Sequence, residues 1–232
     1  FYRSQSALEQ AHIAAALVFE LSKVATAAVR ERTLGCLRTL DESLARRVAD
    51  AMGEPLPAAA EPAQPVQDLP PSPPLALIGK MKPTLEGRAV GILVADGSDG
   101  ATIDKLKRAA QREGAAVKLV APKLGITLKG GKRLTVDGQL AGTPSVVFDA
   151  VASVLAPAQA AKLADEAAVI DWFRDAYGHL KAIAACGGTQ AILDKAGIVK
   201  DAGVVAIDDV DAFIEAAKTR QWQREPTLRS LP

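Results

Sequence analysis

A cysteine followed by two glycines ends an apolar run in residues 181–189 (KAIAACGGT). The run is typical of a buried strand, and the small residues after it favour a tight turn into a helix. A helix N-terminus can lower the pKa of a nearby thiol, and the thiolate is a nucleophile. Cys186 is therefore the candidate residue for covalent chemistry.

The side chains that could hold a metal or haem iron are few. The chain has two histidines, His12 and His179, and two tyrosines, Tyr2 and Tyr177. His12 falls in the first expected helix, and His179 falls at a helix C-terminus, where a partial positive charge is favourable. Neither stands in a cluster with metal-ligand spacing, so we predict structural histidines and no metal site.

A small-residue turn follows the first apolar run, in residues 96–102 (DGSDGAT). A phosphate can bind at a helix N-terminus of this kind. However, Asp96 and Asp99 would repel it, and the full G-x-G-x-x-G spacing is absent. We therefore predict a strand-to-helix turn in which Asp99 caps the helix, and no bound nucleotide.

Composition excludes several classes of function. The chain has 232 residues, 28 lysines and arginines against 27 acids, and two cysteines. This balance argues against nucleic acid and against a polybasic membrane contact, and no apolar run approaches the roughly 20 residues of a membrane span. Two cysteines suit a reducing compartment, so a cytoplasmic location is expected. Phe1 is not a methionine, and we expect the chain to be part of a longer one.

The first block of the chain is predicted to form three helices. Ser6 and Glu9 have the spacing of a capping box. After them comes an apolar stripe at helical spacing, formed by Ile13, Leu17, Leu21 and Val24. The second and third helices are expected over residues 27–40 and 41–52, with Gly53 ending the third. These short helices expose too much apolar surface to be stable alone, and they need a partner surface.

Proline divides the chain. Eight of the 14 prolines lie between Pro55 and Pro74, where fixed φ angles and missing donors exclude helix and central strand. We therefore predict a helical segment over residues 1–54, an extended linker over 55–86 and a domain over 87–232.

The last block alternates strand and helix. The strands are expected at residues 89–96, 117–122, 151–155, 181–186 and 204–207. The helices are expected at residues 101–114, 158–179, 189–196 and 210–221. A hairpin-like insertion is expected over 126–140, with glycine-containing turn signals. Repeated strand–helix units predict an α/β fold, a flavodoxin-like doubly wound parallel sheet.

The order of these blocks resembles that of one family. The motifs that carry the resemblance are FYRS (1–4), EQAHI (9–13), FELSKV (19–24), VRER (29–32), ARRVA (45–49), KMKPTL (80–85) and GRAVGILVADG (87–97). The first five resemble the last helices of a haem catalase core, and the others resemble the C-terminal extension of large-subunit catalases. The resemblance covers essentially all of the chain and identifies it as the carboxy-terminal portion of such a catalase.

The resemblance implies haem in the full-length parent, held by a tyrosine in an Arg-x-x-x-Tyr arrangement, where the arginine lowers the pKa of the phenol. Neither tyrosine here fits that pattern. Tyr2 has only Phe1 before it, and Tyr177 has Phe173 four residues earlier. We therefore predict no cofactor and no catalytic residue in this chain.

The α/β block also resembles the class I glutamine-amidotransferase-like superfamily, including PfpI-type proteins, whose nucleophile is a cysteine on a strained elbow. Matched to that pattern, Gly187 takes the nucleophile position, Gly188 replaces the following histidine, and Cys186 falls one residue early, as a buried strand residue. Residues 155–159 (LAPAQ) replace the Pro-Gly-Gly that would stabilise an oxyanion. In that pattern an acidic residue assists the cysteine, and Asp99 lies near its position. The nucleophile that it would assist is missing.

The leading hypothesis is a non-catalytic structural and interaction domain of a haem catalase that decomposes hydrogen peroxide in the response to oxidative stress. Its partners would be the catalase core of the same polypeptide and neighbouring subunits of a homotetramer. By resemblance, such domains stabilise the oligomer, influence substrate access or act in a chaperone-like way on unfolded clients. The alternative is a PfpI-like cysteine hydrolase or glyoxal-consuming enzyme that uses Cys186.

Overall fold

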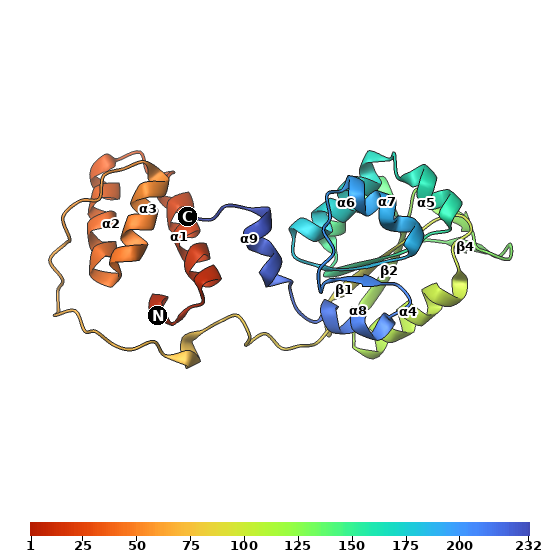
Figure 1. Cartoon of the computed structure of the whole chain (residues 1–232), viewed down its shortest axis with the longest axis horizontal. Helices are drawn as coiled ribbons and strands as arrows, with labels where there is room; N and C mark the ends of the chain where they lie inside the picture. The colour runs from red at the N-terminus through yellow and green to blue at the C-terminus, as the bar shows by residue number, and fades with distance from the viewer. The chain divides into compact units, whose positions relative to one another are not determined.

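The computed structural model describes residues 1–232 and consists of two compact units. The helical unit contains Phe1–Met81 together with Arg229–Pro232, and the α/β unit contains Lys82–Leu228 (Figure 1). None of the helices combines the length and the apolar character that crossing a membrane would require.

The helical unit contains the three helices that the sequence predicts. They are α1 (Ala7–Leu21), α2 (Ala27–Leu40) and α3 (Glu42–Met52), with short 3₁₀ turns at Tyr2–Ser4 and Pro73–Leu75. The capping box is formed, because the Glu9 amide donates to Ser6 Oγ over 3.3 Å and the Ser6 amide donates to Glu9 Oε2 over 2.8 Å. Gly53 ends α3 in the left-handed region, at φ 66°, which costs glycine nothing.

The helices share a small apolar core, and large apolar side chains lie outside it. The buried members of this core are Ala14, Leu21, Leu34, Leu37, Leu44, Ala45, Val48 and Ala49. By contrast, Phe1, Phe19 and Leu40 are 65%, 63% and 68% exposed. The helical unit therefore buries one face of its helices and leaves other apolar surface in contact with solvent.

The proline-rich segment packs against the helices and does not run free. The Arg38 Nη1 donates to the Pro57 carbonyl over 2.6 Å, and the Ala60 amide donates to the Gly35 carbonyl over 3.0 Å. A Cβ at Gly35 would lie 3.0 Å from the Ala58 carbonyl oxygen, so a glycine is needed where the segment crosses α2. Residues 54–72 contain neither helix nor strand, and α2 supplies a donor and an acceptor that hold the segment in place.

Glu9 fastens the far end of this segment to α1. Its Oε1 accepts hydrogen bonds from the amides of Leu77 over 2.9 Å and Ile78 over 2.5 Å. Burial by itself raises the pKa of Glu9, but the hydrogen bonds from Ile78, Ser6 and Leu77 outweigh it and lower the pKa to about 2. We call this arrangement of Glu9, Leu77 and Ile78 the Glu9 clasp. The predicted capping residue therefore has a second role, which its spacing alone does not reveal.

The α/β unit has a six-stranded parallel sheet. Its strands are β1 (Ala89–Val94), β2 (Ala116–Ala121), β5 (Gly138–Gln139), β6 (Ala150–Val154), β7 (Ala182–Ala185) and β8 (Val204–Ala206). They lie in the order β5-β2-β1-β6-β7-β8. The helices are α4 (Gly100–Arg112), α5 (Pro157–Leu163), α6 (Ala167–Gly178), α7 (Gln190–Lys195), α8 (Val210–Ala217) and the short α9 (Glu225–Leu228). This is the doubly wound arrangement that the alternating pattern predicts.

Helices cover both faces of the sheet. Figure 1 shows α4 and α8 on one face and α5, α6 and α7 on the other. Within β1, Ile92 packs with the α4 and α8 side, whereas Leu93 packs with the α5, α6 and α7 side. Both faces of the strand are thus buried, which explains why it reads as an unbroken apolar run.

The predicted long helix over residues 158–179 is two helices, α5 and α6, separated around Ala164 and Glu166. A straight helix of 22 residues would be about 33 Å long, whereas a five-residue strand spans only about 17 Å. The break lets Leu163 and Trp172 both return to the same face of the sheet. The expected last helix also ends earlier, at Ala217.

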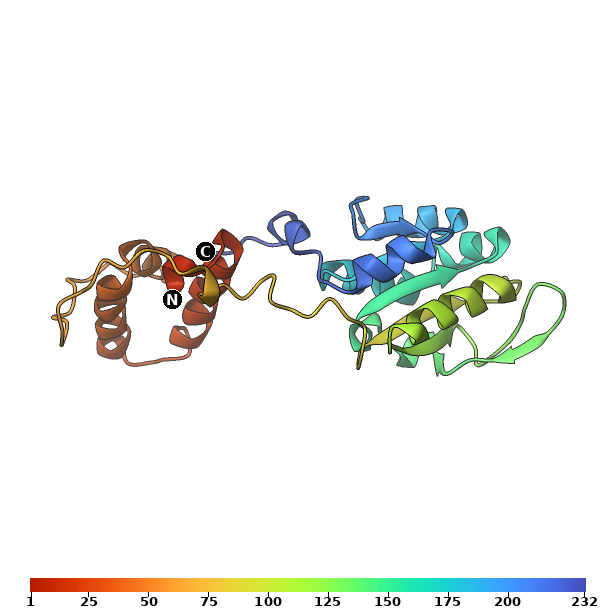
Figure 2. The same cartoon turned by 90° about the horizontal axis from the view of Figure 1, so that it is seen from below.

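The predicted insertion forms an antiparallel hairpin, β3 (Gly125–Thr127) paired with β4 (Arg133–Thr135). Its turn contains Gly130 and Gly131, which have φ angles of 90° and 89°. In Figure 2 the hairpin extends beyond the end of the six-stranded sheet. The chain then returns as β5, which pairs in parallel with β2, a contribution to the main sheet that the sequence did not indicate.

Candidate functional site

Cys186 follows β7 at the carboxyl edge of the sheet and has an ordinary extended conformation, with φ −79° and ψ 160°. A nucleophile elbow holds its residue in a strained turn. Here Leu180 is the one non-glycine residue with positive φ, and it lies before β7, at the opposite edge. The expectation of a fully buried strand cysteine was wrong in detail, because Cys186 lies just past the strand and is only partly buried.

Neutral groups surround the Cys186 thiol. Its Sγ lies 3.0 Å from Thr189 Oγ1 and donates to the Leu155 carbonyl over 3.4 Å. Thr189 Oγ1 in turn lies 2.9 Å from Ser153 Oγ. This chain of thiol and hydroxyl groups contains no imidazole, carboxylate or amine, so it supplies no base to remove the thiol proton.

The start of α5 lies close to the turns that follow β1 and β7. A Cβ at Gly188 would lie 3.3 Å from the Ala160 Cβ and 3.4 Å from the Pro157 Cα. A Cβ at Gly97 would lie 3.3 Å from the Ala156 Cβ. The strand order reverses between β1 and β6, where substrates of doubly wound folds usually bind, and Gly97 and Ala156 follow these two strands.

Asp99 caps α4, as the sequence predicts. Its Oδ2 accepts from the Thr102 amide over 2.9 Å and from the Thr102 hydroxyl over 2.7 Å. These two hydrogen bonds lower the pKa of Asp99 below its ordinary value. The carboxylate is therefore committed to the helix N-terminus, where a phosphate would otherwise bind.

Asp96 holds the β3–β4 hairpin over the same turn. Its carboxylate accepts from the Thr127 amide over 2.8 Å and pairs with Lys123 Nζ over 2.6 Å. The bond with Lys123 and the bond from Thr127 lower the pKa of Asp96. A Cβ at Gly100 would lie 3.2 Å from Leu128 Cδ1. The turn is thus covered by the hairpin, and its acids have structural partners.

The histidines and tyrosines lie apart from one another. His12 is a half-buried residue of α1, and His179 is exposed at the end of α6. The Tyr2 hydroxyl accepts from Arg47 Nη1 over 3.1 Å, and the Tyr177 hydroxyl donates to the Val199 carbonyl over 3.1 Å. No group of three or more His, Cys, Asp or Glu side chains gathers in an arrangement that could hold a metal ion.

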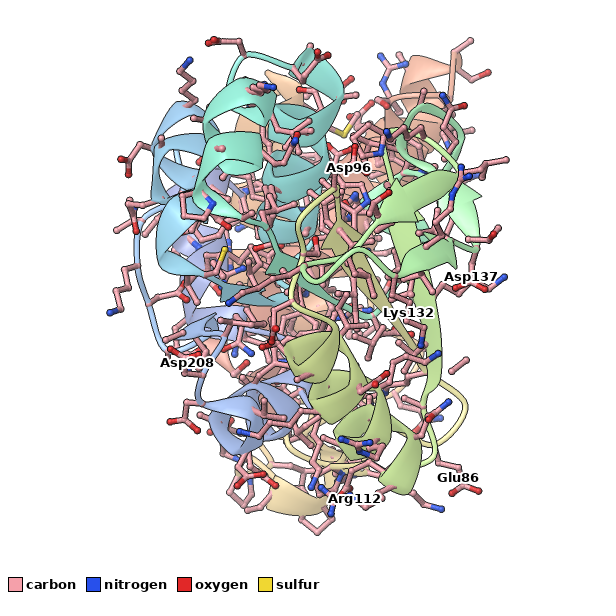
Figure 3. All side chains as sticks on the ribbon, turned by 90° about the vertical axis from the view of Figure 1, so that its right-hand side faces the viewer. Glu86, Asp96, Arg112, Lys132, Asp137 and Asp208 are labelled. Carbon is pink, nitrogen blue, oxygen red and sulfur yellow. The ribbon has the colours of Figure 1, made fainter.

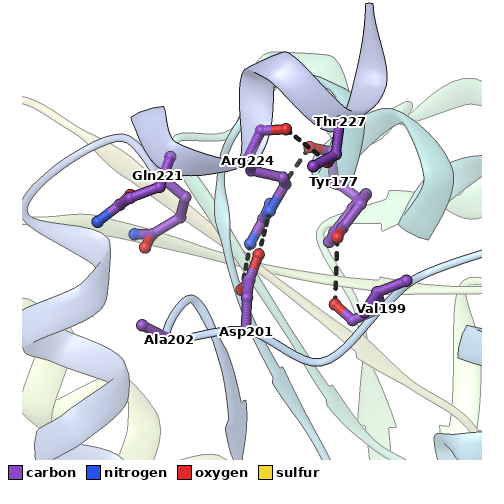
Figure 4. Close-up of a pocket in the computed structure, with 8 residues that line it drawn as sticks. Tyr177, Val199, Asp201, Ala202, Gln221, Arg224 and Thr227 are labelled. Carbon is purple, nitrogen blue, oxygen red and sulfur yellow. Dashed lines mark hydrogen bonds and ion pairs between the residues drawn. The ribbon is translucent and has the colours of Figure 1, made fainter.

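A small pocket opens at the amino edge of the sheet, around Tyr177 and Arg224 (Figure 4). Its volume is about 300 Å³. It is lined by Tyr177, Val199, Asp201, Ala202, Gln221, Gln223, Arg224 and Thr227. This size lies at the lower limit for a site that takes a small molecule. The pocket is therefore a candidate ligand site only if its polar groups have no partners within the protein.

Arg224 uses four of its five N–H donors within the protein. Its Nε and Nη2 donate to the two carboxylate oxygens of Asp201 over 2.6 Å and 2.9 Å. Its Nη1 donates to the carbonyls of Tyr177 over 3.2 Å and Lys181 over 3.0 Å, and the guanidinium lies 4.0 Å from the centre of the Tyr177 ring. Figure 4 shows the bonds from Arg224 to Asp201 and to the Tyr177 carbonyl. The pocket is therefore the outer side of a structural clasp.

The charge state of this clasp follows from its hydrogen bonds. Burial raises the pKa of Asp201, but the bonds from Arg224, and then those from the Gly203 and Val204 amides, lower it below the ordinary value overall. A Cβ at Gly203 would lie 2.4 Å from Gln221 Cγ, so the close approach requires a glycine. The sequence did not identify Arg224 as a partner of Asp201. The Asp201-x-Gly203 turn before a strand was the signal that could have indicated its partner.

Lys181 is a second buried cation at this edge. Its Nζ donates to the carbonyls of Ser145 over 2.8 Å and Val146 over 3.1 Å, and the residue is 3% exposed. Burial, followed by the nearby positive charge of Arg220, lowers the pKa of Lys181 to about 8. The lysine fixes the loop before β6, and no reacting group faces it.

Comparison with known proteins matches two parts of the chain to two families. Residues 86–225 match the C-terminal domain found in long catalases, and residues 1–52 match the family described as catalase-related immune-responsive.

Similar curated proteins come from bacteria and a social amoeba. Catalase C of Rhizobium meliloti is 42% identical over 99% of this chain and 34% of the relative. Catalase HPII of Pseudomonas aeruginosa is 36% identical over 100% of this chain and 33% of the relative. Catalase-B of Dictyostelium discoideum is 30% identical over 100% of this chain and 35% of the relative.

The chain thus spans about a third of the length of these relatives. The α/β unit carries the long-catalase match, and the helices carry the other match. The chain therefore belongs to the long catalases, of which it forms the C-terminal portion.

Proposed function

We propose that this chain is a non-catalytic structural and interaction portion of a haem catalase. Its helices would dock on the catalase core of the same polypeptide, and its α/β unit would contribute to contacts between subunits of a homotetramer. The longer protein would decompose hydrogen peroxide to water and oxygen. Two free thiols, Cys36 and Cys186, support a reducing, cytoplasmic location.

The observation that carries the proposal is the apolar surface of the helical unit. Phe1, Phe19 and Leu40 are each more than 60% exposed, and exposed apolar side chains in such number mark an interaction surface. An apolar partner surface, as the core of a larger fold provides, would remove them from water.

Both tyrosine hydroxyls of this portion have protein partners. The Tyr177 hydroxyl donates to the Val199 carbonyl, and Arg224 covers the ring. The Tyr2 hydroxyl accepts a hydrogen bond from Arg47. These contacts support a proposal that assigns neither a haem ligand nor a catalytic step to this portion.

The test is a thermal unfolding comparison of the longer enzyme with and without residues 82–228, together with its oligomer mass. We expect the truncated enzyme to unfold at a lower midpoint and to lose subunits more readily on dilution. An unchanged midpoint with unchanged oligomer mass would rule out the stabilising role.

A chaperone-like role is a second candidate, favoured by an apolar groove within the helical unit. The groove has a volume of about 730 Å³, and its lining includes Phe1, Leu40, Val66 and Leu69. All four side chains are at least 62% exposed. If this chain fails to suppress aggregation of an unfolding client at equimolar ratio, the role is excluded.

The cysteine-hydrolase alternative has a separate test. The environment of Cys186 predicts slow alkylation compared with the exposed Cys36, and no turnover of ester or glyoxal substrates. Rapid alkylation of Cys186 at neutral pH, together with turnover that Cys186→Ser abolishes, would establish the alternative.

A further inference from the structure

The charges of the α/β unit are separated along its sequence. Residues 97–136 contain nine lysines and arginines against three acids, a net charge of +6. Residues 137–217 contain five lysines and arginines against twelve acids, a net charge of −7. The near-neutral total for the chain therefore conceals two strongly charged halves.

In the folded α/β unit the basic and the acidic stretch are also separated in space. The basic stretch builds α4, β2 and the hairpin, on one side of β1. The acidic stretch builds β6, β7 and β8 on the other side, and its first residues build β5, which pairs with β2. Within the sheet, β2 and β8 are four strand spacings apart, which is about 19 Å. The α/β unit is therefore an electric dipole whose axis runs across the strands.

Both charged ends reach the carboxyl edge of the sheet. The hairpin leaves that edge after β2, and Asp208 lies just beyond β8. In Figure 3, which faces this side of the unit, Asp208 is labelled on the left and Lys132 on the right, and both side chains are visible. One face of the unit thus carries both signs of charge, well apart.

We define the basic pole as Lys129, Lys132 and Arg133, all of which are exposed. The hairpin that carries them is well held. The Lys129 amide donates to the Ser98 carbonyl over 3.0 Å, and the Leu128 amide donates to the Lys132 carbonyl over 2.8 Å. The cations are therefore presented on a fixed support rather than on a free tail.

We define the acidic pole as Asp208, Asp209 and Asp211, which are also exposed. Asp209 Oδ1 accepts from the Ala212 amide over 3.0 Å and caps α8. The side chains of Asp208 and Asp211 form no ion pair within the chain, and the same holds for Lys132 and Arg133. Each pole thus keeps charge that its own unit does not neutralise.

The chain's own connections leave from the other edge. The chain enters β1 at the amino edge, where Arg88 Nη1 donates to the Lys218 carbonyl over 2.6 Å. It leaves after Arg224, which Asp201, Tyr177 and Lys181 fix at that same edge. Both connections to the helical unit therefore start at the amino edge of the sheet.

We propose that two copies of this chain pair through the carboxyl edges of their α/β units, with each basic pole facing the acidic pole of the other copy. A two-fold axis midway between the basic and the acidic pole makes this surface self-complementary. Each basic pole then faces the acidic pole of the other copy, and both contacts form together. This pairing rests on the proposed function, because it would be one of the contacts between subunits that the proposed function requires. Most of its free energy is electrostatic, so it weakens as salt screens the charges.

The experiment measures the mass of the 232-residue chain by sedimentation at about 20 mM and about 500 mM NaCl, which differ several-fold in screening length. The basic-pole variant carries K129E, K132E and R133E. The acidic-pole variant carries D208K and D211K, and retains Asp209 because it caps α8. We expect a dimer at low salt for the unaltered chain, and a dissociation constant raised about tenfold or more in each variant and at high salt.

Two controls separate contact from net charge. The variant K105E/R108E/R112E changes the total charge by the same amount as the basic-pole variant, but on the outer face of α4, and it should leave the dimer nearly intact. An equimolar mixture of the basic-pole and acidic-pole variants should restore a dimer, because each then meets a complementary surface. Circular dichroism of each variant establishes that its fold is retained.

A monomeric unaltered chain at low salt would overturn the proposal. So would equal loss of the dimer in the α4 control, or a variant mixture that stays monomeric. If the truncation of residues 82–228 lowers the midpoint of the longer enzyme while the pole variants leave the mass of this chain unchanged, the proposed function stands and the pairing is wrong. If the poles pair but the truncation has no effect, the pairing stands and the stabilising role is wrong.

Discussion

Arg224 and Asp201 face each other through two parallel hydrogen bonds, with Nε 2.6 Å from Oδ2 and Nη2 2.9 Å from Oδ1. The Arg224 side chain is 1% exposed, whereas that of Asp201 is 30% exposed. The pair joins the segment after α8 to the turn before β8. The last part of the α/β unit is thus secured by a charge pair rather than by apolar packing alone.

Replacing one partner should be costly. Arg224→Ala leaves the Asp201 carboxylate and the Tyr177 and Lys181 carbonyls without their donor. Removing one member of a buried pair costs about 3–5 kcal/mol, and partial exposure of Asp201 places the expected loss near the lower end. Urea unfolding followed by circular dichroism measures it. The exposed Arg174→Ala is the matched control, and its loss should stay below about 1 kcal/mol; equal losses for both arginines would refute this account of the clasp.

Gly91 in β1 has no room for a side chain. An added Cβ would lie 2.5 Å from Phe148 Cδ2 and 2.8 Å from Phe148 Cγ. Gly91→Ala should therefore destabilise the α/β unit by about 1–3 kcal/mol through overpacking. Gly142→Ala, where a Cβ would meet nothing within 4 Å, should have little effect. Phe148→Leu in the Gly91→Ala background should recover part of the loss, and no recovery would show that the ring is not the obstacle.

The Glu9 clasp should loosen in acid. The pKa of Glu9 falls from 4.5 to about 2 when its carboxylate accepts the amides of Ile78, Ser6 and Leu77. Because the folded pKa is the lower one, the contribution of Glu9 is fully present above about pH 4.5 and is lost as pH falls towards 2. Hydrogen exchange of the Leu77 and Ile78 amides, compared between the unaltered chain and Glu9→Gln, measures this. A Glu9→Gln chain with unchanged protection and the same pH dependence would contradict the prediction.

Lys181 should also add stability as pH rises, but in a higher pH range than Glu9. Burial lowers its folded pKa from 10.5 to about 8. Between these pH values the unfolded chain binds the extra proton, so the free energy of unfolding should rise as pH increases from about 8 to 10.5. Lys181→Met should remove this part of the rise. The difference in unfolding free energy between the unaltered chain and Lys181→Met is measured at pH 7 and at pH 10. The change in this difference between the two pH values gives the contribution of Lys181 apart from other titrating groups. A difference that is the same at both pH values would contradict the prediction.

The sequence predicted the elements whose signals are local. The capping box at Ser6 and Glu9, the glycine end of α3 and the apolar strand β1 each depend on residues a few positions apart, and each is present. The alternation of strand and helix likewise predicted the parallel sheet.

Features that depend on distant residues were not visible in the sequence. The break between α5 and α6 reflects the length of the sheet they cover, and the Arg224–Asp201 pair joins residues 23 positions apart. Cys186 was placed on the strand because the apolar run continues to it, although β7 ends one residue earlier. Similarly, proline content predicted the extended backbone of the linker but not its hydrogen bonds to α1 and α2.

The Glu9 clasp also sets the length of the tether. A free segment over residues 55–86 could reach about 100 Å at full extension, whereas the roughly eight residues from Gly79 to Glu86 reach no more than about 28 Å. The volume accessible to the α/β unit grows as the cube of the length of the free linker. Fastening the segment at Leu77 and Ile78 therefore lowers the upper limit of that volume by more than an order of magnitude. Glu9, together with Gln5, whose Nε2 donates to the Leu75 carbonyl over 2.9 Å, therefore leaves only a short part of the linker free.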